Sequence, residues 1–239
     1  MDETPGGSDD EGGFPSVFTD QGYRAAVIDL LGVIAYGELS AFERLVDDAK
    51  LAPTLADKIE LTTMAAAEFG HVEPLLKRIT ELGGDGVAAM EPFVAPFDSF
   101  HVHTAPRDWL EGLVKAFVGD GLAADFYREV AAFVDKDTRE LVIDSLEDAG
   151  GRSDFIVDRV RQAIVADPRV GGRLALWGRR LMGEALSQAQ SVAAERDALT
   201  ALLAGGVDRP GMDLAALGRM FTRLTENHTQ RMERLGLDS

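Results

Sequence analysis

Two polar residues within an apolar helical pattern constrain this chain most. Glu68 and His71 lie three residues apart in the stretch MAAAEFGH, so both side chains project from the same side of a helix. The apolar residues on that side are Leu61, Met64, Ala65, Val72, Leu75 and Ile79. A carboxylate and an imidazole therefore point into a core, where an isolated charge costs free energy. The pattern predicts either a bound metal ion or a buried hydrogen-bonded cluster without metal.

The composition favours a helical protein. The chain has 239 residues, of which 46% are hydrophobic and only 7% are aromatic, and its commonest residues favour helices over strands. A chain of this size can bury a sizeable core in one large domain or two small ones. It contains no cysteine, which excludes disulfides, thiolate metal ligands and cysteine nucleophiles.

The net charge and the hydropathy of the chain argue against nucleic acid and membranes as binding partners. The formal net charge of −17 makes bulk binding to the phosphate backbone of nucleic acid unexpected. No run of 18 apolar residues is present, and the amino terminus is acidic where a signal peptide would be basic and apolar. We therefore expect a cytoplasmic protein that does not bind a membrane.

Apolar periodicity and helix-breaking residues predict a series of helices after an acidic, disordered tail at residues 1–17. The predicted helices span about residues 19–50, 53–82, 106–133, 137–164, 174–203 and 213–235. Residues 83–105 contain two prolines and are predicted to be a long connection, with His101 and His103 as exposed loop histidines. In the last helix, Glu226 and His228 are expected at the surface.

Other carboxylates fall on the expected inner faces of these helices. Glu38 interrupts the apolar stripe of the first helix, and Asp120 lies in that of the third. Four-helix bundles that hold two metal ions take a Glu from each of two helices and Glu-x-x-His from each of the other two, with one long crossover. Glu38, Glu68 and His71 match the first half of this scheme. Asp120 and either Glu147 or Asp148 are the candidates for the second half.

The second half lacks its histidine. Gly150 and Gly151 stand where a histidine would follow Glu147 or Asp148, and Arg152 comes next. Adjacent glycines weaken a helix, so a kink or bulge is expected here. Arg152 is either an exposed residue after the kink or a fixed positive charge in place of the second metal ion.

Taken together, the helix order, Glu38, the Glu68-Phe-Gly-His71 motif, the long crossover and the later carboxylates resemble the ferritin-like superfamily. The chain is most similar to the branch of the tRNA hydroxylase that acts on an isopentenylated adenosine, which includes actinobacterial ferritin-like proteins. The resemblance covers about residues 18–165, and it implies an all-α ferritin-like four-helix bundle. Residues 166–239 are expected to form a pair of additional helices packed on the bundle.

The resemblance also implies a non-haem di-iron centre that activates dioxygen and hydroxylates an unactivated carbon. Glu38 would then bind one iron, Glu68 would bridge, and His71 would be a terminal ligand, with Asp120 and Glu147 or Asp148 serving the second iron. Manganese uses nearly the same ligands. The implied substrate is a small molecule or a modified nucleoside, and the apolar edges of the last two helices allow a homodimer.

Two other functions follow from the same residues. Because one half-site is degraded, the bundle could instead be a non-catalytic interaction or metal-binding protein. Simple iron storage is a third reading, which the additional carboxy-terminal helices disfavour because they would hinder assembly of a cage.

Overall fold

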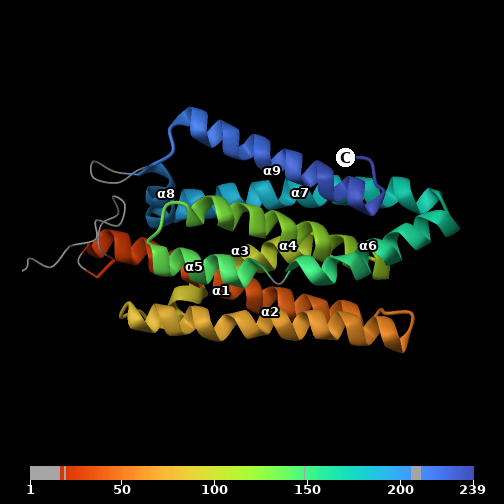
Figure 1. The fold of residues 1–239 in the computed structure, drawn as a ribbon, viewed down its shortest axis with the longest axis horizontal. Helices are drawn as coiled ribbons and strands as arrows, with labels where there is room; N and C mark the ends of the chain where they lie inside the picture. Colours follow the sequence, from red (N-terminus) through yellow and green to blue (C-terminus); the bar gives the residue numbers. More distant parts are fainter. Residues whose placement is uncertain (1–16, 19, 148, 206–210) are drawn as a thin grey trace, which may run out of the picture.

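The structure is a computed structural model that describes residues 17–18, 20–147, 149–205 and 211–239. This part of the chain contains helices and no strands (Figure 1). The helices are α1 (Gln21–Ala49), α2 (Leu55–Glu81), α3 (Gly86–His103), α4 (Trp109–Ala131), α5 (Lys136–Glu147), α6 (Ala149–Ala166), α7 (Arg169–Glu195), α8 (Asp197–Ala204) and α9 (Leu214–Leu235). The predicted acidic tail lies almost wholly outside the described residues.

Four rods form the central bundle. These are α1, α2, α4 and a fourth rod in which α5 and α6 lie end to end (Figure 1). Helix α1 packs against α2 and α4, and α4 packs against both α5 and α6. The predicted all-α four-helix bundle is confirmed. The kink predicted at Gly150 and Gly151 stays a prediction, because residue 148 beside them lies outside the described residues.

Helix α1 lies in the interior of the molecule. It contacts α2, α3, α4 and α8, and its 29 residues are long and apolar enough to cross a membrane. Burial explains that composition, because 56% of its most apolar window is buried inside the protein. At Gly32 an added Cβ would overlap the carbonyl group of Ala89 on α3, so this glycine allows the two helices to approach closely.

The crossover differs from its prediction. Residues 86–103 form helix α3 rather than a loop, although Pro92 and Pro96 lie inside it. Each proline removes one helical hydrogen bond, and the carbonyl groups so released belong to Ala88 and Pro92, which are exposed. Water can therefore satisfy these carbonyl groups, and the inward-facing Ala89 and Phe93 remain buried.

The carboxy-terminal region contains a third short helix in addition to the expected pair. Helix α7 packs on α4 and α3, and α9 packs on α4 on the same side of the bundle (Figure 1). A break at Arg196 separates α7 from α8, which lies against α1. Arg196 binds Asp29 of α1 at 2.5 Å, and this ion pair fixes the start of α8.

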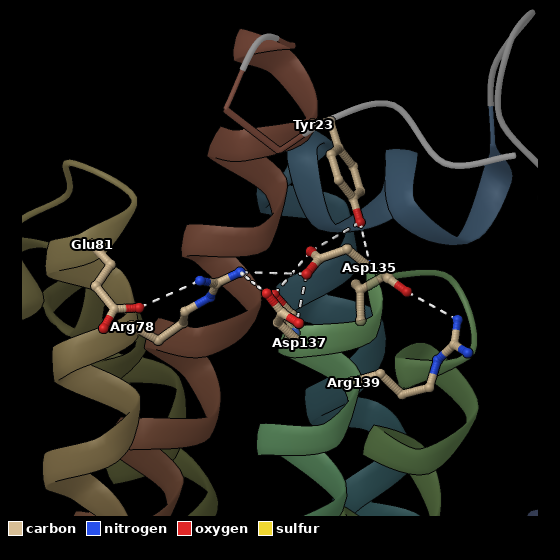
Figure 2. A network of polar contacts seen from close by, with 8 residues as sticks. Tyr23, Arg78, Glu81, Asp135, Asp137 and Arg139 are labelled. Carbon is tan, nitrogen blue, oxygen red and sulfur yellow. Dashed lines mark hydrogen bonds and ion pairs between the residues drawn. The ribbon is translucent and has the colours of Figure 1, made fainter. Parts of the chain in front are cut away.

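Polar contacts fix the ends of the bundle helices. Thr54 caps α2 by accepting a hydrogen bond from the backbone N–H of Asp57, whose buried carboxylate binds Arg159 of α6 at 2.6 Å. At the start of α5, Asp135 accepts a hydrogen bond from Arg78 of α2, and its backbone N–H donates to the Tyr23 hydroxyl of α1 at 2.6 Å (Figure 2). We call the second group the Asp135 network.

Candidate metal centre and cavity

Glu38, Glu68 and His71 meet between α1 and α2. Each offers one ligand atom, and these three atoms lie within 4.8 Å of one another. Nδ1 of His71 lies 3.1 Å from Oε2 of Glu38. Glu38 is buried, while Glu68 and His71 are partly buried. The structure thus brings together the three residues that form the first half of the predicted site.

Asp120 of α4 faces the same space. Asp120, Glu38 and Glu68 all line one cavity inside the bundle. Burial and then the negative charge of Glu38 raise the pKa of Asp120 to about 7, and the more distant charge of Lys115 opposes this shift. Without a metal ion, therefore, the site tends to hold a proton on Asp120 rather than another negative charge.

The remaining predicted ligands fall outside this description. Helix α5 ends at Glu147 and α6 begins at Ala149, but the side chains of Glu147, Asp148 and Arg152 lie outside the described part of the structure. Their roles as ligands or as a substitute charge stay predictions. The backbone places the end of α5 beside the cavity, since Ser145 and Leu146 line it.

The donor set of the first half fits a metal ion. Metal–ligand bonds of about 2.0–2.2 Å place two ligands of one ion at most about 4.4 Å apart, which small rotations of these side chains would reach from 4.8 Å. Two carboxylates and an imidazole suit iron or manganese. A divalent cation would also offset the charges that now raise the pKa of Asp120.

The cavity is large and mostly apolar. Its volume is about 630 Å³, and it extends from the carboxylates along the space between α1, α4, α7, α8 and α9. Its apolar lining includes Leu30, Val33, Val130, Leu146, Leu186, Leu199 and Leu203. Cavities of this size hold small organic ligands. The candidate metal centre therefore opens onto a space suited to an aliphatic group.

The histidines of α3 and α9 differ from their predicted environments. His101 is not an exposed loop residue: it lies on α3, lines the cavity and accepts a hydrogen bond from Lys115 at Nδ1. His103 is exposed, as expected, but it is helical. His228 is buried on the inner side of α9 and not at the surface, because α9 packs this side against α4.

Sequence reasoning missed a group of polar residues elsewhere in the lining of the cavity. Arg44, Asp48, His101 and Lys115 line it there. A signal for Asp48 was present, because it follows Glu38, Ala41 and Leu45 at helical spacing. Tyr127 was predicted only as a core residue, yet its side chain lines the cavity near Glu38.

Comparisons with known proteins agree with this architecture. The model of the actinomycete ferritin-like domain family matches residues 21–206. Among solved structures, the chain is similar to protein 19 with aldehyde deformylating oxidase activity from Synechococcus, with a TM-score of 0.69 and 21% identity over 92% of this chain and 94% of that one. No curated protein matches the sequence significantly. Because the family model covers most of its length, this chain belongs to the actinomycete ferritin-like domain family.

Proposed function

We propose that this protein is a di-iron-type oxidoreductase that activates dioxygen and oxidises an aliphatic group held in the cavity. The observation that carries the proposal is the convergence of Glu38, Glu68 and His71 at the wall of a largely apolar cavity. When bound there, iron would supply the electrons for dioxygen chemistry. The protein supplies the ligands, the apolar space and the exclusion of bulk water.

Each acidic residue has a role in this proposal. Glu38 and His71 would hold the first ion, and Glu68 would lie between the two ion positions. Asp120, with Glu147 or Asp148, would hold the second ion. The same residues suit manganese, so the identity of the metal follows from the cell's supply as well as from the ligands.

Tyr127 offers a hydrogen-bond donor within the cavity. Burial and the negative charge of Glu38 raise the pKa of its hydroxyl above the ordinary value, so the hydroxyl stays protonated throughout the physiological range. It can therefore donate to an oxygen atom of a ligand beside Glu38. This is a positioning role, because no proton leaves the residue.

The names of similar proteins support the reaction class only. The Synechococcus protein carries aldehyde deformylating oxidase activity in its description, and the sequence resemblance to the tRNA hydroxylase branch, which the comparisons do not show, implies hydroxylation of an aliphatic carbon. Both are oxidations, but a shared fold does not transfer a substrate. The modified nucleoside stays a prediction, since no described residue favours a nucleoside over a plain aliphatic chain.

The second candidate is a non-catalytic metal-binding bundle. The observation that favours it is the absence of a histidine at the second half-site, where Gly150 and Gly151 stand. Such a protein would bind one ion at Glu38, Glu68 and His71 and would not couple that ion to dioxygen.

Oxygen uptake after the addition of ferrous iron tests the proposal. Wild-type protein should bind up to two iron ions per chain and consume dioxygen. His71→Ala should lose both properties, whereas His103→Ala, which changes an exposed histidine of α3, should retain them. Iron binding without oxygen uptake would favour the non-catalytic bundle, and no iron binding would exclude both readings.

A further inference from the structure

A buried ammonium group lies where the cavity meets a second pocket. Lys115 is only 6% exposed. Its Nζ donates to the carbonyl oxygen of Thr104 at 2.9 Å and to Nδ1 of His101 at 3.0 Å. Among the residues that the structure describes, no carboxylate forms an ion pair with it. The carboxylate of Asp48 acts on the ammonium group electrostatically without forming an ion pair with it. A buried charge is costly when no opposite charge contacts it, so an anion in contact with Lys115 would lower this cost.

His101 does not supply that charge. Because its Nδ1 accepts a hydrogen from Lys115, its proton must be on Nε2, which donates to Oγ of Ser40 at 2.6 Å. Burial, followed by the positive charges of Lys115 and Arg44, lowers the pKa of His101 to about 3. The imidazole is therefore neutral and orients the ammonium group without balancing it.

The second pocket connects this position with the outside. Its volume is about 310 Å³, and it shares Arg44, Asp48, His101 and Lys115 with the apolar cavity. These four residues consequently form the wall between the two spaces. The remaining lining of the outer pocket is Asp47, Lys50, Leu51, Ala105 and Pro106.

The charges at this wall suit a singly charged anion. Arg44 adds a second positive charge at the outer edge, where it lies 3.5 Å from Asp47 and 3.9 Å from Glu43. Asp48 is buried and its carboxylate packs against Gly112 of α4, where an added Cβ would leave no room for it. Its negative charge opposes a second negative charge on a ligand, so a dianion such as phosphate fits poorly.

We propose that Lys115, assisted by Arg44, binds the carboxylate of a long-chain aliphatic acid whose chain lies in the apolar cavity. As a statement about the substrate, this rests on the proposed function, although the binding itself does not. Lys115 and Asp120 are five residues apart on α4, which is about 7.5 Å of helix rise. The carbon that faces Glu38 and Asp120 is therefore several bonds away from the acid group.

The opposite orientation of the ligand conflicts with the charges of the metal-free protein. An acid group at the candidate metal centre would meet the carboxyl groups of Glu38, Glu68 and Asp120, which line the cavity there. At Lys115 it would meet an ammonium group whose hydrogen bonds, within the described part of the chain, go to neutral acceptors. Acid binding to metal-free protein therefore reports the Lys115 position.

Calorimetric titration of metal-free, full-length protein tests the proposal, with dodecanoate, dodecan-1-ol and inorganic phosphate as probes. Wild-type protein should bind dodecanoate at least tenfold more tightly than the alcohol and should bind phosphate weakly or not at all. Lys115→Met should lose this preference for the acid while keeping its affinity for the alcohol, because the apolar cavity is unchanged.

Lys50→Met is the matched control. Lys50 lines the same outer pocket, but it is exposed and already paired with Asp47 at 2.6 Å, so its loss should leave dodecanoate affinity unchanged. If Lys115→Met fails to fold, Arg44→Gln should still lower dodecanoate affinity severalfold relative to the alcohol. Equal binding of acid and alcohol by wild-type protein would overturn the proposal without any variant.

The result is separable from that of the proposed function. Iron binding with no preference for the acid would overturn the carboxylate site alone. A preference for the acid in a protein that never binds iron would overturn the proposed oxidoreductase alone.

Discussion

Two groups of carboxylates lie in this bundle, and they differ in what balances them. In the Asp135 network, Arg78 contacts Glu81, Asp135 and Asp137 (Figure 2). At the metal centre, Glu38 and Asp120 lie close enough that the charge of one raises the pKa of the other.

The difference shows which group stabilises the fold. The Asp135 network joins α1, α2 and α5 through a cation that the chain provides, so it is complete in the protein alone. Under the proposed function, the candidate metal centre is complete only when a cation is added. We therefore expect substitutions in the network to destabilise the protein and substitutions in the metal centre to leave the metal-free protein as stable or more stable.

The largest effect should come from Arg78→Met. The side chain of Arg78 is only 11% exposed. Its removal takes from Asp135 the guanidinium group that it contacts, which should lower the free energy of unfolding by about 3 kcal/mol. Arg169→Met, which removes an exposed partner of Asp167, should cost less than about 0.5 kcal/mol. If the two variants lost the same free energy of unfolding in denaturant titrations, Arg78 would not stabilise the fold more than an exposed arginine does.

Asp120→Asn should have the next largest effect, and in the opposite direction. Because the pKa of Asp120 is raised to about 7 in the folded protein, the folded state binds more protons than the unfolded state between about pH 4 and pH 7. Stability should therefore fall as the pH rises through this range. The neutral asparagine should remove that loss.

The free energy of unfolding of Asp120→Asn should equal that of the wild type at pH 4 and exceed it by about 2 kcal/mol at pH 8. This is roughly half of what the full pKa shift of Asp120 would give, because the buried amide must also find hydrogen-bond partners. The measurement is urea unfolding of metal-free protein across this pH range. If Asp120→Asn were less stable than the wild type at pH 8, the carboxylates of the candidate metal centre would stabilise the metal-free fold as the Asp135 network does, which contradicts the account.

A pair of tyrosine substitutions gives the smallest effects. The hydroxyl of Tyr23 accepts a hydrogen bond from the backbone N–H of Asp135, so Tyr23→Phe should cost about 1.5 kcal/mol. Tyr127 is also buried, but its hydroxyl faces the cavity, and Tyr127→Phe should change stability by less than about 0.5 kcal/mol. A larger loss of stability for Tyr127→Phe than for Tyr23→Phe in thermal unfolding would show that the cavity tyrosine, and not the Asp135 network, stabilises the fold.

The apolar periodicity of the sequence was sufficient to predict most helices of the bundle. The apolar spacing on α1 and α2, the cap at Asp20 and the stop at Gly83 predicted these helices to within about two residues. Helix α3 was missed because Pro92 and Pro96 usually indicate a loop, although Ala89, Phe93, Phe97 and His101 keep helical spacing. Tertiary packing and exposed carbonyl groups outweigh the local preference there.

The candidate site was predictable only in part. Glu38, Glu68 and His71 each interrupt an apolar stripe, and such interruptions are visible in a sequence. Lys115 and His101 come from α4 and α3, and neither helix shows that their side chains meet. Contacts of that kind depend on the angle and rotation of packed helices, which single-sequence periodicity does not specify.

Metal content of the purified protein tests the central claim most directly. Wild-type protein, reconstituted with ferrous iron without oxygen and freed of excess ions, should contain one or two ions per chain. Glu68→Ala should contain none, while Glu60→Ala, which removes an exposed glutamate from α2, should match the wild type. Equal metal content in Glu68→Ala and wild-type protein, or no metal in either, would contradict the claim that Glu38, Glu68 and His71 form a metal centre.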